Sequence, residues 1–150
     1  MSSATTQHAS MTALQVALDA RPGLDGVPVR SAPSLRADAS TREAVELWDT
    51  EADEDWRLLG NRRKEETYRI HGGIYTLKAG NSEAVVTATR ARAVALLDEI
   101  LDALADDPTL GGTVRVARLA RNQLNQDFTD TGRWCLIEFW IECEAHLNVS

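Results

Sequence analysis

Residues 82–106 read SEAVVTATRARAVALLDEILDALAD, and the predicted strands lie on both sides of this segment in the chain. Its apolar side chains recur at the spacing of a helix that buries one face. Ser82 suits the N-cap, because its hydroxyl can accept from N–H groups of the first turn, and Pro108 ends the helix. At about 1.5 Å per residue the predicted helix is roughly 37 Å long, enough to cover a small sheet. The predicted buried stripe is Val86, Ala93, Leu97, Ile100, Leu101 and Leu104.

Around this helix, length and composition predict one domain. The chain has 150 residues, of which 43% are hydrophobic and 26% charged, as in ordinary globular proteins. We expect a flexible leader at 1–10 without signal-peptide character, a single α+β domain at 11–147 and a C-terminal tail at 148–150. The net charge of −7 opposes general affinity for nucleic acid, and no apolar run approaches the roughly 20 residues of a membrane span.

Strands are predicted on both sides of the helix by alternating apolar residues and by turn residues. The predicted strands are 43–48, 56–59, 66–77, 113–128 and 133–147. The acidic run at 51–55 is expected to be a solvated hairpin loop, because it lacks the pattern of a calcium loop. A short helix is predicted at 11–20, with Ser10 or Thr12 as its N-cap. The predicted fold class is α+β, a mostly antiparallel β-sheet packed by one long central helix and a short N-terminal helix.

Two of the predicted strands contain irregular positions. Gly72 and Gly73 lie in the middle of a strand, where glycine marks a bulge or a close backbone approach. Leu119 breaks the alternation of its strand, which predicts a bulge near Ala117 and Arg118.

The last strand has the clearest alternation in the chain, and it predicts a dry face and a mixed face. The dry face is Cys135, Ile137, Phe139, Ile141, Cys143, Ala145 and Leu147. The mixed face is Trp134, Leu136, Glu138, Trp140, Glu142, Glu144 and His146. Eight residues of strand separate the two cysteines by roughly 26 Å, whereas a disulfide needs Cα atoms within about 7 Å. Both cysteines are therefore expected to be buried free thiols.

Motifs for catalysis or metal binding are absent from the sequence. The three histidines are far apart in the chain: His8, His71 and His146. No CxxC or HxxxH spacing occurs, so we predict no metal, no cofactor and no catalytic residue. Glu138, Glu142 and Glu144 share one strand face and could serve acid–base chemistry, but a solvated or interface face explains them as well.

Arginine and tryptophan mark a predicted interface. Arg115, Arg118, Arg121 and Arg133 are expected to cluster on the final hairpin, where they could contact phosphates or acids of a neighbouring subunit. Trp134 and Trp140 lie among glutamates, either as interface anchors or beneath intramolecular cover.

The order of these segments resembles a known family. The segments are YRIHGGIYTLKAG at 68–80, ATRARAVALLDEILDALADDPTLGG at 88–112, VRVARLA at 114–120 and GRWCLIEFWIECEAHL at 132–147, and ADDPTLGGTVRVARL at 105–119 is the most family-like string. From Met11 to Leu147 the chain resembles tail terminator (tail completion) proteins of long-tailed bacteriophages, especially those that infect actinobacteria.

The resemblance implies a structural virion protein, not an enzyme. Its subunits would form a homo-oligomeric ring, expected to be a hexamer, that caps the tail tube, ends tail elongation and joins the tail to the head connector or stopper protein. DNA would pass through without specific binding, and assembly would take place in the host cytoplasm. The alternatives are another head–tail connector or neck protein of similar fold, a small-molecule-binding domain or an enzyme.

Acidic residues are predicted to line the lumen of such a ring, because like charge repels DNA phosphates over a Debye length of about 8 Å. The predicted lumen acids are Asp53, Glu54, Asp55, Glu138 and Glu142. The alternative is that they keep the protein soluble or pair with arginines of the next subunit.

Overall fold

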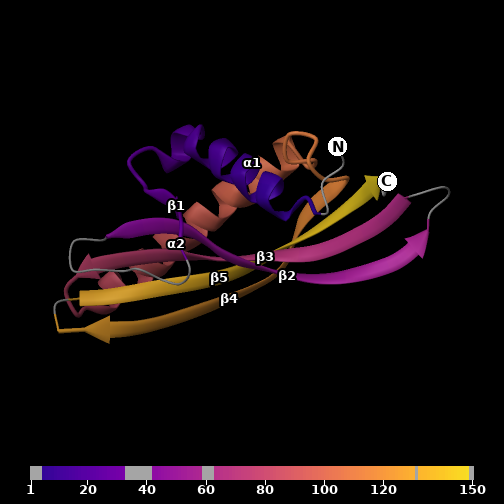
Figure 1. Ribbon diagram of the computed structural model, residues 1–150. Coiled ribbons are helices and arrows are strands. Elements are labelled where there is room, and N and C mark those ends of the chain that lie inside the picture. The colour runs from indigo at the N-terminus through magenta and orange to yellow at the C-terminus, as the bar shows by residue number, and fades with distance from the viewer. Residues whose placement is uncertain (1–4, 33–41, 59–62, 131, 149–150) are drawn as a thin grey trace.

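The computed structural model describes residues 5–32, 42–58, 63–130 and 132–148, which form a sheet with helices on one face (Figure 1). The strand order is β1-β2-β3-β5-β4; β1 runs parallel to β2, and the other neighbouring pairs are antiparallel. The elements are α1 (Gln7–Asp19), the 3-10 turn η1 (Pro22–Leu24), β1 (Val29–Ser31), β2 (Glu43–Leu58), β3 (Arg63–Ala79), α2 (Glu83–Asp106), β4 (Val116–Thr129) and β5 (Gly132–Asn148). The α+β class is confirmed, with a mixed sheet and two helices. Neither helix is long and apolar enough to span a membrane within these ranges.

The acidic run at 51–55 lies inside β2, so its predicted hairpin loop is wrong. β2 is one continuous strand that pairs with β3 from Glu43 to Leu58. Acids are compatible with a strand because the backbone makes the ladder hydrogen bonds while alternate side chains point away from the core. The prediction took account of the charge of these residues but not of their pairing with β3.

The predicted close approach at the glycine pair is confirmed. A Cβ on Gly72 would lie 2.3 Å from the carbonyl oxygen of Glu46, and one on Gly73 would lie 2.4 Å from the indole of Trp48. The bulge itself is in the neighbouring strand: Leu47 pairs with Gly72 and Asp49 pairs with His71, which leaves Trp48 as the extra residue. The bulge predicted in β4 falls between Leu119 and Arg121, slightly later than expected.

The helix predicted at 82–106 is confirmed as α2, and the Ser82 hydroxyl accepts from the Val85 N–H at 3.3 Å. Its predicted stripe is partly wrong. Leu101 is 37% exposed, whereas Leu96 and Ala103 are buried. The buried arc is rotated because α2 packs against both the sheet and α1, and a pattern that assumes one buried face misses the second contact.

The N-terminal helix begins earlier than predicted. α1 starts at Gln7, so neither Ser10 nor Thr12 caps it, and residues 7–10 of the expected leader are helical. Ser10 is instead fully buried inside the helix, where its hydroxyl contacts the Tyr68 hydroxyl at 2.5 Å. A polar residue early in a helix resembles a cap when its tertiary partner is unknown.

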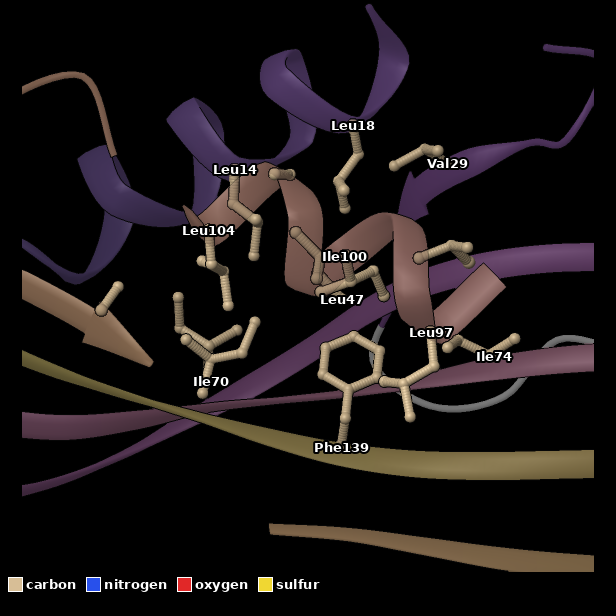
Figure 2. Close-up of a cluster of buried hydrophobic side chains, with 14 of the residues drawn as sticks. Leu14, Leu18, Val29, Leu47, Ile70, Ile74, Leu97, Ile100, Leu104 and Phe139 are labelled. Atoms are coloured by element: carbon tan, nitrogen blue, oxygen red, sulfur yellow. The ribbon is translucent and has the colours of Figure 1, made fainter. Parts of the chain in front are cut away.

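The core lies between the helices and the sheet (Figure 2). Side chains from the sheet, α2 and α1 meet there: Leu47, Ile70, Ile74, Phe139, Leu97, Ile100, Leu104, Leu14 and Leu18. All seven residues predicted for the dry face of the last strand are buried, including both free cysteines. This packing fixes which face of β2–β5 is turned away from the helices.

Candidate interaction surface

The face of the sheet turned away from α1 and α2, called here the outer face, carries most of the predicted interface residues. The even-numbered residues of β5 from Trp134 to His146 point to this face and are partly or fully exposed, as predicted. Arg115 and Arg118 contact glutamates of that strand, and Arg121 contacts Trp140. Residues distant in the chain therefore meet on one surface.

A row of side chains crosses all four long strands on the outer face. Asp49, His71, Trp140 and Arg121 are register neighbours on β2, β3, β5 and β4. The rings of His71 and Trp140 stack with centroids 4.6 Å apart and an interplanar angle of 6°. The Arg121 guanidinium lies 4.7 Å from the Trp140 centroid. The Trp140 ring therefore contacts side chains of both neighbouring strands, and Trp140 remains partly exposed.

The two bulges direct residues onto this row. Trp48 is the extra residue of the β2 bulge, and its indole meets His71 edge-on with centroids 4.9 Å apart. Arg121 follows immediately after the β4 bulge. Bulges re-aim side chains in this way. The sequence did not predict this row of side chains, although the glycine pair Gly72 and Gly73 indicated a close neighbour at this position.

His71 lies between two carboxylates. Its Nδ1 is 3.1 Å from Asp49 Oδ1, and its Nε2 is 2.9 Å from Glu138 Oε2. Only the imidazolium form carries an N–H on both nitrogens, so this form can donate to both acids at once. Glu138, a predicted lumen acid without an expected partner, therefore has one within its own chain.

A second row alternates in charge. Glu51, Arg69, Glu142 and Arg118 are register neighbours across the same four strands. Arg118 donates to Glu142 at 2.8 Å, and this hydrogen bond raises the pKa of Arg118 above its ordinary value. Arg115 donates to Glu144. The sequence predicted that these arginines contact phosphates or a neighbouring subunit. In the structure, Arg115 and Arg118 pair with glutamates of the same hairpin.

Two predicted interface residues lie apart from these rows. Trp134 stacks on Tyr75 with centroids 6.5 Å apart, towards the other end of the sheet. Arg133 does not join the arginine cluster, because its position alternates to the helix-facing side. There it lies 5.1 Å from the centroid of Phe128, beside a hollow of about 240 Å³.

The predicted lumen acids occupy two places. Glu138 and Glu142 lie on the outer face in the pairs described above. Asp53, Glu54 and Asp55 lie in β2, opposite residues 65–67 of β3, and their side chains fall outside the described part of the structure.

A shallow hollow of about 200 Å³ lies beside the second row, lined by Glu51, Thr67, Tyr68, Arg69 and Glu142. It is smaller than the roughly 300–1,000 Å³ of typical ligand pockets. In the described ranges no group of three or more His, Cys, Asp or Glu side chains could hold a metal ion.

A buried polar cluster beneath α1 was also missed. Glu66 is fully buried and accepts from the Thr6 N–H at 2.9 Å and the Thr6 hydroxyl at 3.0 Å. The Tyr68 hydroxyl meets both Thr6 and Ser10, and burial raises the pKa of Tyr68 to about 12. These contacts tie the start of α1 to β3, which explains why the helix begins before the predicted boundary.

Comparison with known proteins identifies no family for this arrangement: no family model matches the chain, and a search of curated proteins finds no match.

Proposed function

We propose that this protein is a structural subunit of a ring, the tail terminator of a long-tailed bacteriophage. The observation that supports the proposal most is the convergence of Trp140, Arg115, Arg118 and Arg121 on the outer face. These residues come from β5, from β4 and from the residue that precedes β4, and the sequence pattern predicts an interface for each of them. The resemblance of residues 11–147 to tail terminators supplies the biological context.

The chemistry of the outer face favours a contact or lumen surface over a substrate site. Its polar side chains pair with one another, as His71 does with Asp49 and Glu138, so few are directed at a common point. The adjacent hollow of about 200 Å³ is small for a substrate. This is the arrangement expected of a surface that must remain polar without binding a ligand.

In this proposal the ring is a hexamer that caps the tail tube and contacts the head connector or stopper. DNA passes through its centre, and the mature location is the phage neck. The helix α2 would be the central support of each subunit, since its residues reach both the sheet and α1. Another neck protein of similar fold is the nearest alternative, because the same surface would serve a connector ring.

Electron microscopy of the purified full-length chain, combined with light scattering after size-exclusion chromatography, tests the proposal. We expect ring particles with a central opening and a mass about six times the 16.5 kDa of one chain. A monomer that persists at every concentration and salt, and that also fails to bind purified tail tubes, would contradict the ring. A ring that binds a portal-proximal connector but not tail tubes would favour the alternative neck position.

A further inference from the structure

The helix-facing side of β4 and the neighbouring flank of α2 carry exposed apolar residues, and together they are called here the α2–β4 face. Its apolar residues are Val94 and Leu101 of α2, which are 39% and 37% exposed, and Leu124 and Phe128 of β4, which are 37% and 66% exposed. Leu124 and Phe128 are register partners of odd-numbered residues of β5, so they point to the same side of the sheet as the helices. Four of the five large apolar residues that are exposed in the described part of the chain thus lie on this face.

Contacts on its two flanks show how α2 is turned. On the β4 flank, the Val86 carbonyl accepts from the Gln126 side chain at 3.1 Å. On the other flank, Glu99 pairs at 2.8 Å with Arg21, the second residue after α1. Because an α-helix has about 3.6 residues per turn, Val94 and the exposed leucine two turns after it lie on the side of Val86 and not on the side of Glu99. The side of α2 that contacts α1 is therefore a different one.

Two charges of opposite sign flank Val94 on this side of α2. Arg90 precedes Val94 by four residues and Asp98 follows it by four, and residues four apart are neighbours on a helix surface. Both residues are exposed, and neither has an ion-pair partner among the residues that the structure describes. Along the helix the face is therefore basic, apolar and acidic in turn, with Val94 at its centre.

Such a face is complementary to itself. Consider two copies of α2 that pack antiparallel about a two-fold axis beside Val94. Each residue before Val94 then meets the residue that lies equally far after Val94 in the other copy. Arg90 of each copy lies beside Asp98 of the other, and the two Val94 side chains meet at the centre. The arrangement forms two ion pairs from charges that are unpaired in the single chain.

The exposed end of β4 extends this contact. Phe128 lines a hollow of about 240 Å³ together with Val86. The same axis sets residue 102 of one copy level with Val86 of the other, because both positions are eight residues from Val94. Phe128 of each copy therefore lies level with Leu101 of the other, and their contact would remove exposed apolar surface from water.

We infer that the α2–β4 face is the contact of a homodimer, in which two copies pack α2 antiparallel against α2 about a two-fold axis beside Val94. The same patch serves both copies, so the contact ends at two chains. It goes beyond the proposed ring, because a ring built about one rotation axis turns all its copies the same way and contains no two-fold contact. The dimer therefore joins chains that are not in a ring. Salt should weaken it, since its ion pairs are exposed in the single chain.

Charge exchange on the full-length chain tests the contact. By light scattering after size-exclusion chromatography, the natural chain should show, besides any rings, a species of about twice the 16.5 kDa of one chain. Arg90→Glu and Asp98→Arg each place like charges together at two points, so each should weaken this dimer by about tenfold or more. The combined variant Arg90→Glu/Asp98→Arg restores opposite charges and should restore the dimer. The matched control Asp19→Arg makes the same charge change as Asp98→Arg on an exposed position of α1 and should dimerise as the natural chain does.

Disulfide trapping gives a second readout, which reports the position of the axis. Val94→Cys places one thiol of each copy beside the axis and should give a cross-linked dimer under oxidation, with no larger species. Leu101→Cys is the control: its two copies would lie roughly 21 Å apart along the helices, too far for a disulfide. The two natural cysteines are buried and do not interfere.

The outcomes separate the dimer from the ring. Restoration by charge exchange, together with a cross-link at Val94→Cys and none at Leu101→Cys, would establish the contact. A natural chain that shows no species of two chains and gives no Val94→Cys cross-link would overturn it, whether or not rings form. Dimers that form normally while neither rings nor binding to tail tubes is found would overturn the ring and leave the dimer in place.

Discussion

At the scale of single residues, the two thiols give the protein a specific pH dependence. Burial raises the pKa of Cys135 from 9.0 to about 11 and that of Cys143 from 9.0 to about 12. Above pH 9 the unfolded chain loses these protons while the folded chain keeps them, so the stability falls as the pH rises. The loss should approach about 1.4 kcal/mol per pH unit for each thiol.

Urea unfolding at a series of alkaline pH values measures this effect. The matched control is Cys135→Ala/Cys143→Ala, whose stability should fall less steeply over the same range. Equal slopes for the two proteins would show that the thiols are not buried in the folded state.

The same residues show what a sequence can predict at this scale. Burial of Cys135 and Cys143 followed from strict alternation, which is a local property of one strand. The contacts of Thr6 with Glu66 and of Ser10 with Tyr68 were not predictable, because they join positions more than fifty residues apart. A polar side chain does not indicate by itself whether its partner is water, a helix end or another strand.

At the scale of the strands, the position of Trp48 depends on a glycine beside it. A Cβ on Gly73 would lie 2.4 Å from the Trp48 ring, so Gly73→Ala should displace the indole from His71 and cost about 1–3 kcal/mol, as overpacking does. In a Trp48→Ala background the same substitution should cost much less. Denaturation of the four proteins of this double-mutant cycle measures the coupling. Additive losses would mean that the indole does not occupy this position.

The strands also show where pattern reading fails. The hairpin of β4 and β5 was predictable because a short turn joins two alternating segments. The continuation of β2 through its acidic residues was not predictable, because its pairing with β3 is a non-local interaction that the sequence of β2 does not indicate. The bulge at Trp48 was not predictable for the same reason, because the residue pattern that indicates it, the glycine pair, lies on β3 and not on β2.

At the scale of the whole molecule, the acids of the outer face bear on how DNA would pass the ring. In the proposed ring every subunit would turn its outer face in the same direction. If the face lines the lumen, Glu138→Lys/Glu142→Lys rings should still form but bind DNA in a salt-dependent way, because phosphates are no longer repelled. The control, Glu83→Lys/Asp102→Lys, makes the same charge change on exposed positions of α2 and should not bind.

Gel shift and electron microscopy of the same samples measure both properties. If the Glu138→Lys/Glu142→Lys rings are intact and do not bind DNA, the outer face does not line the lumen. Reversal of Asp53, Glu54 and Asp55 distinguishes the two roles open to β2: rings that bind DNA place these acids in the lumen, and loss of rings places them at the subunit contact.

The pairing of β3 with β5 has a mechanical consequence. These two strands lie in the middle of the sheet and pair antiparallel along their whole length, from Arg63 opposite Asn148 to Ala79 opposite Gly132. A tension directed along the strands would load all the hydrogen bonds of this ladder in shear at once, whereas a tension across the sheet would open them one after another. The subunit should therefore resist pulling along its strands far better than pulling across them, and a ring with its strands along the channel would present its strong direction to the axial force of moving DNA.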